Sequence, residues 1–205
     1  MKRQINIPNK LITAITLIVI LIAINAFRIS DDLKFIEPSI TEKDSIASIE
    51  AFGKVYTVLM SPRCMNCHPA GDVPLQGDDS HLHQMAPKRG KDGKGLTAMK
   101  CANCHQPANI PGVGTPPGNP KWALPPADMK MVFEGKTARQ LAIQILDYKQ
   151  NGHKNKQQLI EHARDTLVKS GWTMGENRKP PPLTYEEFVI AWDTWINKGA
   201  FVPAE

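Results

Sequence analysis

The sequence predicts a mainly α-helical protein with long loops rich in proline and glycine, preceded by an N-terminal apolar helix. Three observations lead to this class. Helix-capping signatures recur ahead of stretches whose apolar residues repeat with helical spacing. Ten of the twenty residues from 107 to 126 are proline or glycine, which excludes a long helix or a central strand there. An apolar run of 17 residues lies close to the N-terminus.

The first 28 residues are predicted to direct export. Residues 1–10 hold three cations and no acid, and residues 11–27 form the apolar run. This run suits a cleavable signal peptide, and it also reaches the short end of what spans a bilayer, so a membrane anchor is the alternative. In both cases the cations stay inside and the chain beyond Arg28 lies outside the cytoplasm. We therefore expect a periplasmic protein, either soluble after cleavage or anchored to the cytoplasmic membrane.

The rest of the 205 residues is enough for one modest domain. Residues 29–44 are predicted to be a tether and residues 45–205 the folded domain. Thr41 and Asp44 have the spacing of a capping box, and apolar side chains recur with helical spacing from there to about Met60. We expect a helix that ends at this point and leads directly into a cysteine motif.

The C-terminal third is predicted to be helical. Three capping residues each precede a Gln or Glu by three positions: Thr137 with Gln140, Asn155 with Gln158, and Thr184 with Glu187. These pairs predict helices over about 138–149, 156–169 and 185–197, the last closed by Gly199 as a left-handed cap. Trp192 and Trp195 on the last helix are expected in the core. The polar, glycine-rich stretch 71–95 is expected to be a loop.

The charge pattern argues against nucleic-acid binding. Three of the +5 formal charges belong to the N-terminal segment, which leaves +2 for the rest of the chain. A nucleic-acid-binding protein would need a basic stripe, preferably with stacking aromatic residues. We expect the single basic cluster to be a solvated loop or a source of counterions, with a docking patch as the alternative. This cluster consists of Lys88, Arg89, Lys91, Lys94 and Lys100.

All four cysteines belong to two copies of the motif C-x-x-C-H. Cys64 and Cys67 precede His68, and Cys101 and Cys104 precede His105. Two thiols at this spacing can form thioethers with the two vinyl groups on one porphyrin edge, and the adjacent histidine then lies beneath the iron. We therefore expect a small dihaem c-type cytochrome. Its four cysteines would attach two covalent haems, and its two motif histidines would be the proximal iron ligands.

Other uses of four cysteines explain less of the pattern. A zinc ribbon separates its C-x-x-C pairs by about 15 to 20 residues, whereas 33 residues separate Cys67 from Cys101. A thioredoxin-like dithiol is expected near a βαβ pattern, which this sequence does not show. Structural disulfides suit an exported protein, but they leave both histidines unexplained.

The sixth ligand of each iron is open to several side chains. A methionine opposite histidine raises the reduction potential, a second histidine generally lowers it, and an open iron can bind peroxide or a gas. His81 and His83 lie in a loop that can fold back on either haem, and Met129 and Met131 follow the Pro/Gly-rich segment. His162 borders the apolar face of a predicted helix, where an exposed surface position is the alternative.

Several segments resemble a known family of small bacterial dihaem proteins, named as a cytochrome subunit of isoquinoline 1-oxidoreductase. The similarity covers most of residues 50–200 and rests on Ser61-Pro62-Arg63-Cys64-x-x-Cys67-His68-Pro69, Asp79-Ser80-His81-x-His83, Met131-Val132-Phe133-Glu134-Gly135-Lys136-Thr137 and Glu161-His162. The resemblance implies a periplasmic cytochrome that accepts electrons from a molybdenum hydroxylase acting on an N-heterocycle or an aldehyde. The attachment residues carry over unchanged.

Together these patterns predict an electron-transfer protein with a redox partner and no catalytic activity of its own. The first alternative is a dihaem peroxidase-like enzyme in which one iron lacks a protein ligand, although dihaem peroxidases are longer as a family. The second is a haem-based sensor, for which the sequence offers no recognisable output domain.

Overall fold

A computed structural model describes residues 41–204. The predicted export segment 1–28 and most of the predicted tether lie outside the described residues. The part of the chain that is described is mainly helical, as the sequence predicts. Within it, no helix is both long and apolar enough to cross a membrane.

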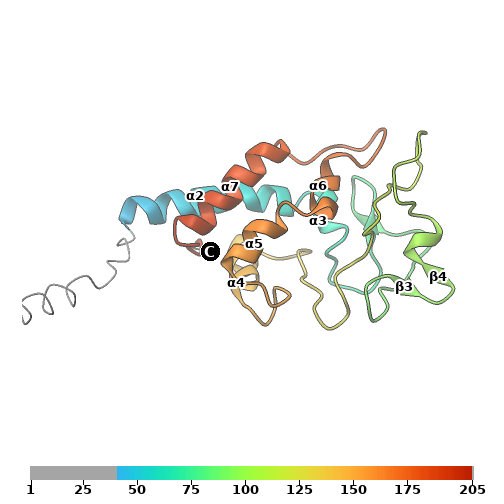
Figure 1. The fold of residues 1–205 in the computed structure, drawn as a ribbon, viewed down its shortest axis with the longest axis horizontal. Helices are drawn as coiled ribbons and strands as arrows, with labels where there is room; N and C mark the ends of the chain where they lie inside the picture. Colours follow the sequence, from blue (N-terminus) through green and yellow to red (C-terminus); the bar gives the residue numbers. More distant parts are fainter. Residues whose placement is uncertain (1–40, 205) are drawn as a thin grey trace, which may run out of the picture. The chain divides into compact units, whose positions relative to one another are not determined.

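Helix α2, Glu42–Leu59, begins where its capping signature predicts. The side-chain oxygen of Thr41 accepts a hydrogen bond from the backbone N–H of Asp44 at 3.2 Å, which satisfies one of the free donors of the first helical turn. The apolar face of α2 packs along α7, Tyr185–Asn197, as Figure 1 shows. Phe52 of α2 and Trp195 of α7 are part of this contact, with ring centroids 4.5 Å apart.

The three C-terminal capping boxes all form as predicted. Helix α4 spans Ala138–Leu146 and packs against α2, while α7 has the predicted bounds. Helix α4 ends before the predicted residue 149 because Asp147 adopts an extended conformation, with ψ 108°. Its carboxylate accepts a hydrogen bond from Lys149 N–H at 2.9 Å, a local contact that competes with the helical pattern.

The single helix predicted over 156–169 is wrong. The structure contains α5, Lys156–His162, then a break, then α6, Thr166–Lys169, which leads into the short helix η2, Ser170–Trp172. Asp165 causes the restart, because its carboxylate accepts a hydrogen bond from Leu167 N–H at 2.8 Å and caps a new first turn. The break leaves His162 at the end of α5.

Buried aromatic and aliphatic side chains of α2, α4, α5 and α7 form one core. Trp192 and Trp195 lie in it as predicted, 5% and 0% exposed. The chain leaves α7 through Gly199, which has φ 109°, and Ala200, which has the left-handed φ of 54°. The predicted cap at Gly199 is therefore a two-residue turn, closed by a hydrogen bond from Ala200 N–H to the carbonyl of Trp195 at 2.8 Å.

Loops and two small hairpins make up most of residues 66–137 (Figure 1). Strand β1, Leu75–Gln76, pairs antiparallel with β2, His81–Leu82. Strand β3, Gly95–Leu96, pairs antiparallel with β4, Met99–Lys100. Stretch 71–95 is thus a loop that contains short strands.

The Pro/Gly-rich segment is clamped to this loop region. Leu124 N–H donates to the carbonyl of Gly93 at 3.0 Å. A side chain at Gly93 would place its Cβ 1.9 Å from the carbonyl oxygen of Leu124, so only glycine allows this approach. Arg89 is 1% exposed and donates to the carbonyls of Pro125 at 2.6 Å and Gly71 at 3.0 Å. Arg89 therefore holds the fold together, and the lysines alone form the exposed part of the predicted basic cluster.

Candidate functional site

Both C-x-x-C-H motifs are wound into helical turns. Cys64 lies in α3, Pro62–Met65, which follows α2 directly, and Cys101 begins η1, Cys101–Asn103. In the first motif His68 N–H donates to the carbonyl of Met65 at 2.9 Å, and in the second His105 N–H donates to the carbonyl of Cys101 at 2.9 Å. The local winding brings each histidine back towards the cysteines that precede it.

His68 is held by two contacts with a segment far along the chain. Its ring nitrogen Nδ1 lies 2.7 Å from the backbone carbonyl oxygen of Met131. Its ring stacks on Phe133, with centroids 3.9 Å apart and an interplanar angle of 7°. Phe133 is itself fixed, because its N–H donates to the carbonyl of His68 at 2.9 Å. The backbone of Met131 has φ 47°, a value that non-glycine residues rarely adopt. In this conformation its carbonyl oxygen faces His68.

His105 repeats this arrangement with different residues. Its Nδ1 lies 2.7 Å from the backbone carbonyl oxygen of Pro117. Its ring stacks on Trp122, with centroids 4.2 Å apart and an interplanar angle of 12°. Both supports come from the Pro/Gly-rich segment, which therefore covers one side of His105.

These contacts fix the chemical form of both imidazoles. A carbonyl oxygen can only accept a hydrogen bond, so Nδ1 carries the proton and Nε2 carries the free lone pair. Burial, together with the nearby charges of His162 and Arg89, lowers the pKa of His68 to about 4. The pKa of His105 is also lowered, mainly by burial. Both pKa shifts favour the neutral imidazole, and a neutral ring whose Nδ1–H donates to a carbonyl is the form in which histidine binds a metal.

Three of the four cysteine thiols have raised pKa values, whereas a reactive dithiol has a lowered one. Burial raises the pKa of Cys64 to about 12 and that of Cys67 to about 11. Burial also raises the pKa of Cys101. Redox-active cysteines have lowered pKa values, so these thiols do not resemble a thioredoxin-like pair. Across residues 41–204, no group of three or more His, Cys, Asp or Glu side chains lies together as a metal site.

A cavity of about 580 Å³ lies in the loop region. Cys101, Cys104 and His105 line it together, and Trp122 and Leu124 add apolar surface. Its volume falls within the roughly 300–1,000 Å³ of small-molecule and cofactor sites. Cys67 lies on the same cavity wall, so the first motif reaches the cavity that contains the second.

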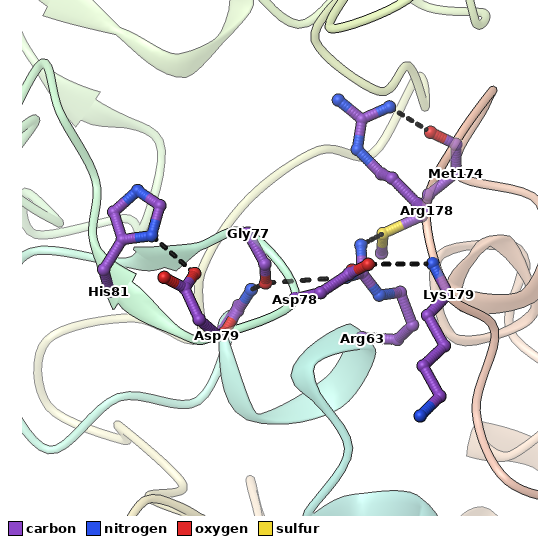
Figure 2. A network of polar contacts seen from close by, with 9 residues as sticks. Arg63, Gly77, Asp78, Asp79, His81, Met174, Arg178 and Lys179 are labelled. Atoms are coloured by element: carbon purple, nitrogen blue, oxygen red, sulfur yellow. Dashed lines mark hydrogen bonds and ion pairs between the residues drawn. The ribbon is translucent and has the colours of Figure 1, made fainter.

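Arg63 and Arg178 also line this cavity, and Figure 2 shows the contacts of both side chains. The Arg63 side chain is 4% exposed and pairs with Asp78, while its Nε has no hydrogen-bond partner among residues 41–204. Arg178 donates to the carbonyls of Met174 at 2.8 Å and Thr115 at 2.7 Å. Burial lowers the pKa of Arg178, and the charge of Arg63 adds to this effect. Two neighbouring cations of this kind favour a ligand that carries carboxylates.

The predicted distal histidines lie in different surroundings. His83 lies on the cavity wall that also contains His105, with ring centroids 6.4 Å apart. His81 is exposed, and its Nδ1 lies 2.6 Å from the carboxylate of Asp79, towards which it points in Figure 2. His162 lies at the surface and is exposed. The surrounding protein nevertheless lowers the pKa of His162 by desolvation, and the charge of His162 in turn lowers the pKa of His68.

The two methionines predicted as distal ligands, Met129 and Met131, lie in the segment that contacts His68. Met131 offers its carbonyl to the Nδ1 side of His68, and its sulfur lies 3.5 Å from the side-chain nitrogen of Gln144. Met129 is half-buried in a turn closed by its N–H and the carbonyl of Pro126 at 3.0 Å.

The sequence did not predict the residues that support His68 and His105. The carbonyls that accept from the two rings lie 63 residues after His68 but 12 residues after His105. The sequence therefore has no common spacing that identifies Phe133 and Trp122 as equivalent. The cations of the cavity wall, Arg63 and Arg178, likewise come together only in the folded chain.

Comparisons with known protein families, with curated proteins and with solved structures find no match.

Proposed function

We propose that this protein transfers electrons through two covalently attached c-type haems. The observation that carries the proposal is the repeated environment of His68 and His105. Each C-x-x-C-H histidine has Nδ1 on a backbone carbonyl, its ring against an aromatic side chain, and Nε2 left free. A metal ligand needs this fixed orientation and tautomer, whereas a structural histidine does not need both in duplicate.

The residues fit the two groups as follows. Cys64 and Cys67 would attach one haem, with His68 as its proximal ligand. Cys101 and Cys104 would attach the other, with His105 as its proximal ligand. A bound haem supplies an iron that gains and loses one electron, with a potential set by its ligands and surroundings.

The cavity walls support binding of the second group. The apolar surface of Trp122 and Leu124 would suit a porphyrin face and would limit the access of water to its iron. Arg63 and Arg178 would pair with the carboxylates at the porphyrin edge. Since Cys67 opens onto this cavity, the two attached groups would be neighbours. Neighbouring redox groups favour a relay of electrons within one chain.

The sequence also supports a proposal for the cellular location of the protein and for its electron donor. The N-terminal pattern supports a periplasmic protein, soluble or held at the cytoplasmic membrane. The resemblance to the dihaem subunit family supports a molybdenum hydroxylase as the electron donor. Purified dihaem protein should then be reduced when such an enzyme and its N-heterocyclic or aldehyde substrate are both added, and not by either alone.

Potentiometric titration of the matured protein tests the relay. We expect two reversible one-electron transitions in the haem absorption bands and no turnover of hydrogen peroxide. An iron that stays high-spin, binds cyanide and turns over peroxide would contradict the relay and favour the peroxidase-like alternative.

A further inference from the structure

We propose that His83 is the distal ligand of the iron bound by His105, so that two imidazoles hold this haem on opposite faces. The inference rests on the proposed function, since it requires a haem on Cys101 and Cys104. It selects one side chain from the several that the sequence leaves open.

The distance between the two rings carries the argument. A metal–imidazole bond is about 2.0 Å long, and a ring nitrogen lies about 1.1 Å from the ring centre. Two imidazoles on opposite sides of one metal therefore have centroids roughly 6.3 Å apart. The centroids of His83 and His105 are 6.4 Å apart. The two rings are too far apart to touch, and both line the cavity that would hold the haem.

The backbone places His83 at this position. Residue 83 follows β2, His81–Leu82, directly, and its N–H donates to the carbonyl of Pro74 at 3.0 Å, which continues the β1–β2 hairpin. The half-buried ring is therefore attached to an anchored strand end. Its Nδ1 receives only a 3.3 Å contact from Met85 N–H. Nδ1 is the acceptor in this long hydrogen bond, so a ring that binds iron through Nε2 and carries its proton on Nδ1 gives up one weak contact.

Other side chains near the cavity are less well placed. His81 does not line the cavity, and its ring is engaged by Asp79 (Figure 2). The sulfur of Met174 lies 3.9 Å from a guanidinium nitrogen of Arg63, and Met85 is 63% exposed. Met99 also lines the cavity and is the competitor that the experiment must separate.

The coordination predicts a low reduction potential for this haem. A histidine–methionine pair raises the potential of a c-type haem, whereas a pair of histidines generally lowers it. The second haem would then be low-spin with nitrogen on both sides and would show no absorption band of a thioether ligand.

Paramagnetic resonance of the full-length ferric dihaem protein tests the assignment. His83→Ala should convert one of the two irons from low-spin to high-spin, and added imidazole should restore the low-spin signal. His81→Ala is the matched control, from the same hairpin, and should leave the spectrum unchanged. His83→Met should stay low-spin, gain a thioether absorption band and raise one of the two potentials.

The outcomes separate this inference from the proposed function. If intact mass shows two haems in His83→Ala and the spectrum matches the wild type, His83 is not the ligand, while the dihaem proposal stands. A thioether band that Met99→Leu removes and that is lost together with the second haem, when Cys101 and Cys104 are changed to serine, would also overturn the assignment. If His83→Ala fails to fold, unchanged potentials in His83→Met would equally show that His83 does not bind the iron.

Discussion

Replacing Phe133 by alanine removes the ring that lies against His68. Phe133 is 6% exposed, so almost its whole side chain is buried in the native state. Truncation of a buried phenylalanine costs about 3–5 kcal/mol, of which an aromatic pair accounts for about 0.5–1.5 kcal/mol. Phe133→Leu keeps most of the apolar volume and loses the stacking, so it should cost less than about 1.5 kcal/mol.

Urea unfolding of the haem-loaded protein measures both costs. With a slope of about 2 kcal/mol per molar urea, Phe133→Ala should lower the midpoint by about 1.5–2.5 M and Phe133→Leu by less than about 0.8 M. Both variants should perturb the absorption of the haem proposed for the first motif and leave that of the second unchanged. Equal midpoints for the two variants, or a loss below about 1 kcal/mol for alanine, would refute the packing argument.

Two further predictions concern the loop clamp and the pH dependence. Gly93→Ala should destabilise the protein by more than about 2 kcal/mol and lower loading of the second haem, because its Cβ would meet the Leu124 carbonyl at 1.9 Å. Gly135→Ala, at φ 72° with no atom within 4 Å of the added Cβ, should cost only the backbone strain of about 1–2 kcal/mol. A chain with both cysteines of the first motif changed to serine should lose stability as the pH falls from about 6.5 towards 4. The unfolded chain protonates His68 in that range, whereas burial lowers its folded pKa to about 4.

A specific result would contradict the glycine prediction, and another would contradict the pH prediction. Thermal unfolding that places the two glycine variants at the same stability would remove the role assigned to the Gly93 clamp. For the pH prediction, the His68→Gln version of the same serine chain should show a smaller acid-side loss, and the part that remains comes from other histidines whose pKa burial lowers, such as His162. If it retains the full loss, His68 is not the buried group responsible.

The helix starts were predictable because capping is local. The reciprocal contacts of Thr137, Asn155 and Thr184 span three residues each, so their sequence signature contains the whole interaction. The break after His162 was not predictable from periodicity. The apolar pattern continues through residues 163–168, and a single side chain, Asp165, restarts the helix by capping Leu167.

Part of the candidate site was likewise predictable from the sequence, and part was not. The attachment motifs are contiguous, so the sequence predicts their residues directly. The carbonyls and aromatic rings that orient His68 and His105 come from other segments, at unrelated spacings, and only the folded chain brings them together. The sequence also gives no reason to prefer His83 over His81 as an iron ligand, because both lie in the same loop. Their surroundings differ because one ring meets Asp79 and the other faces the cavity.

The intact mass of the protein produced in a haem-attaching host tests covalent attachment of two haems. We expect a covalent mass increase equal to two haems. Serine in place of Cys64 and Cys67 should remove one of them, and serine in place of Cys101 and Cys104 should remove the other. A wild-type chain that carries no covalent macrocycle, or that holds stoichiometric zinc on its cysteines, would contradict it.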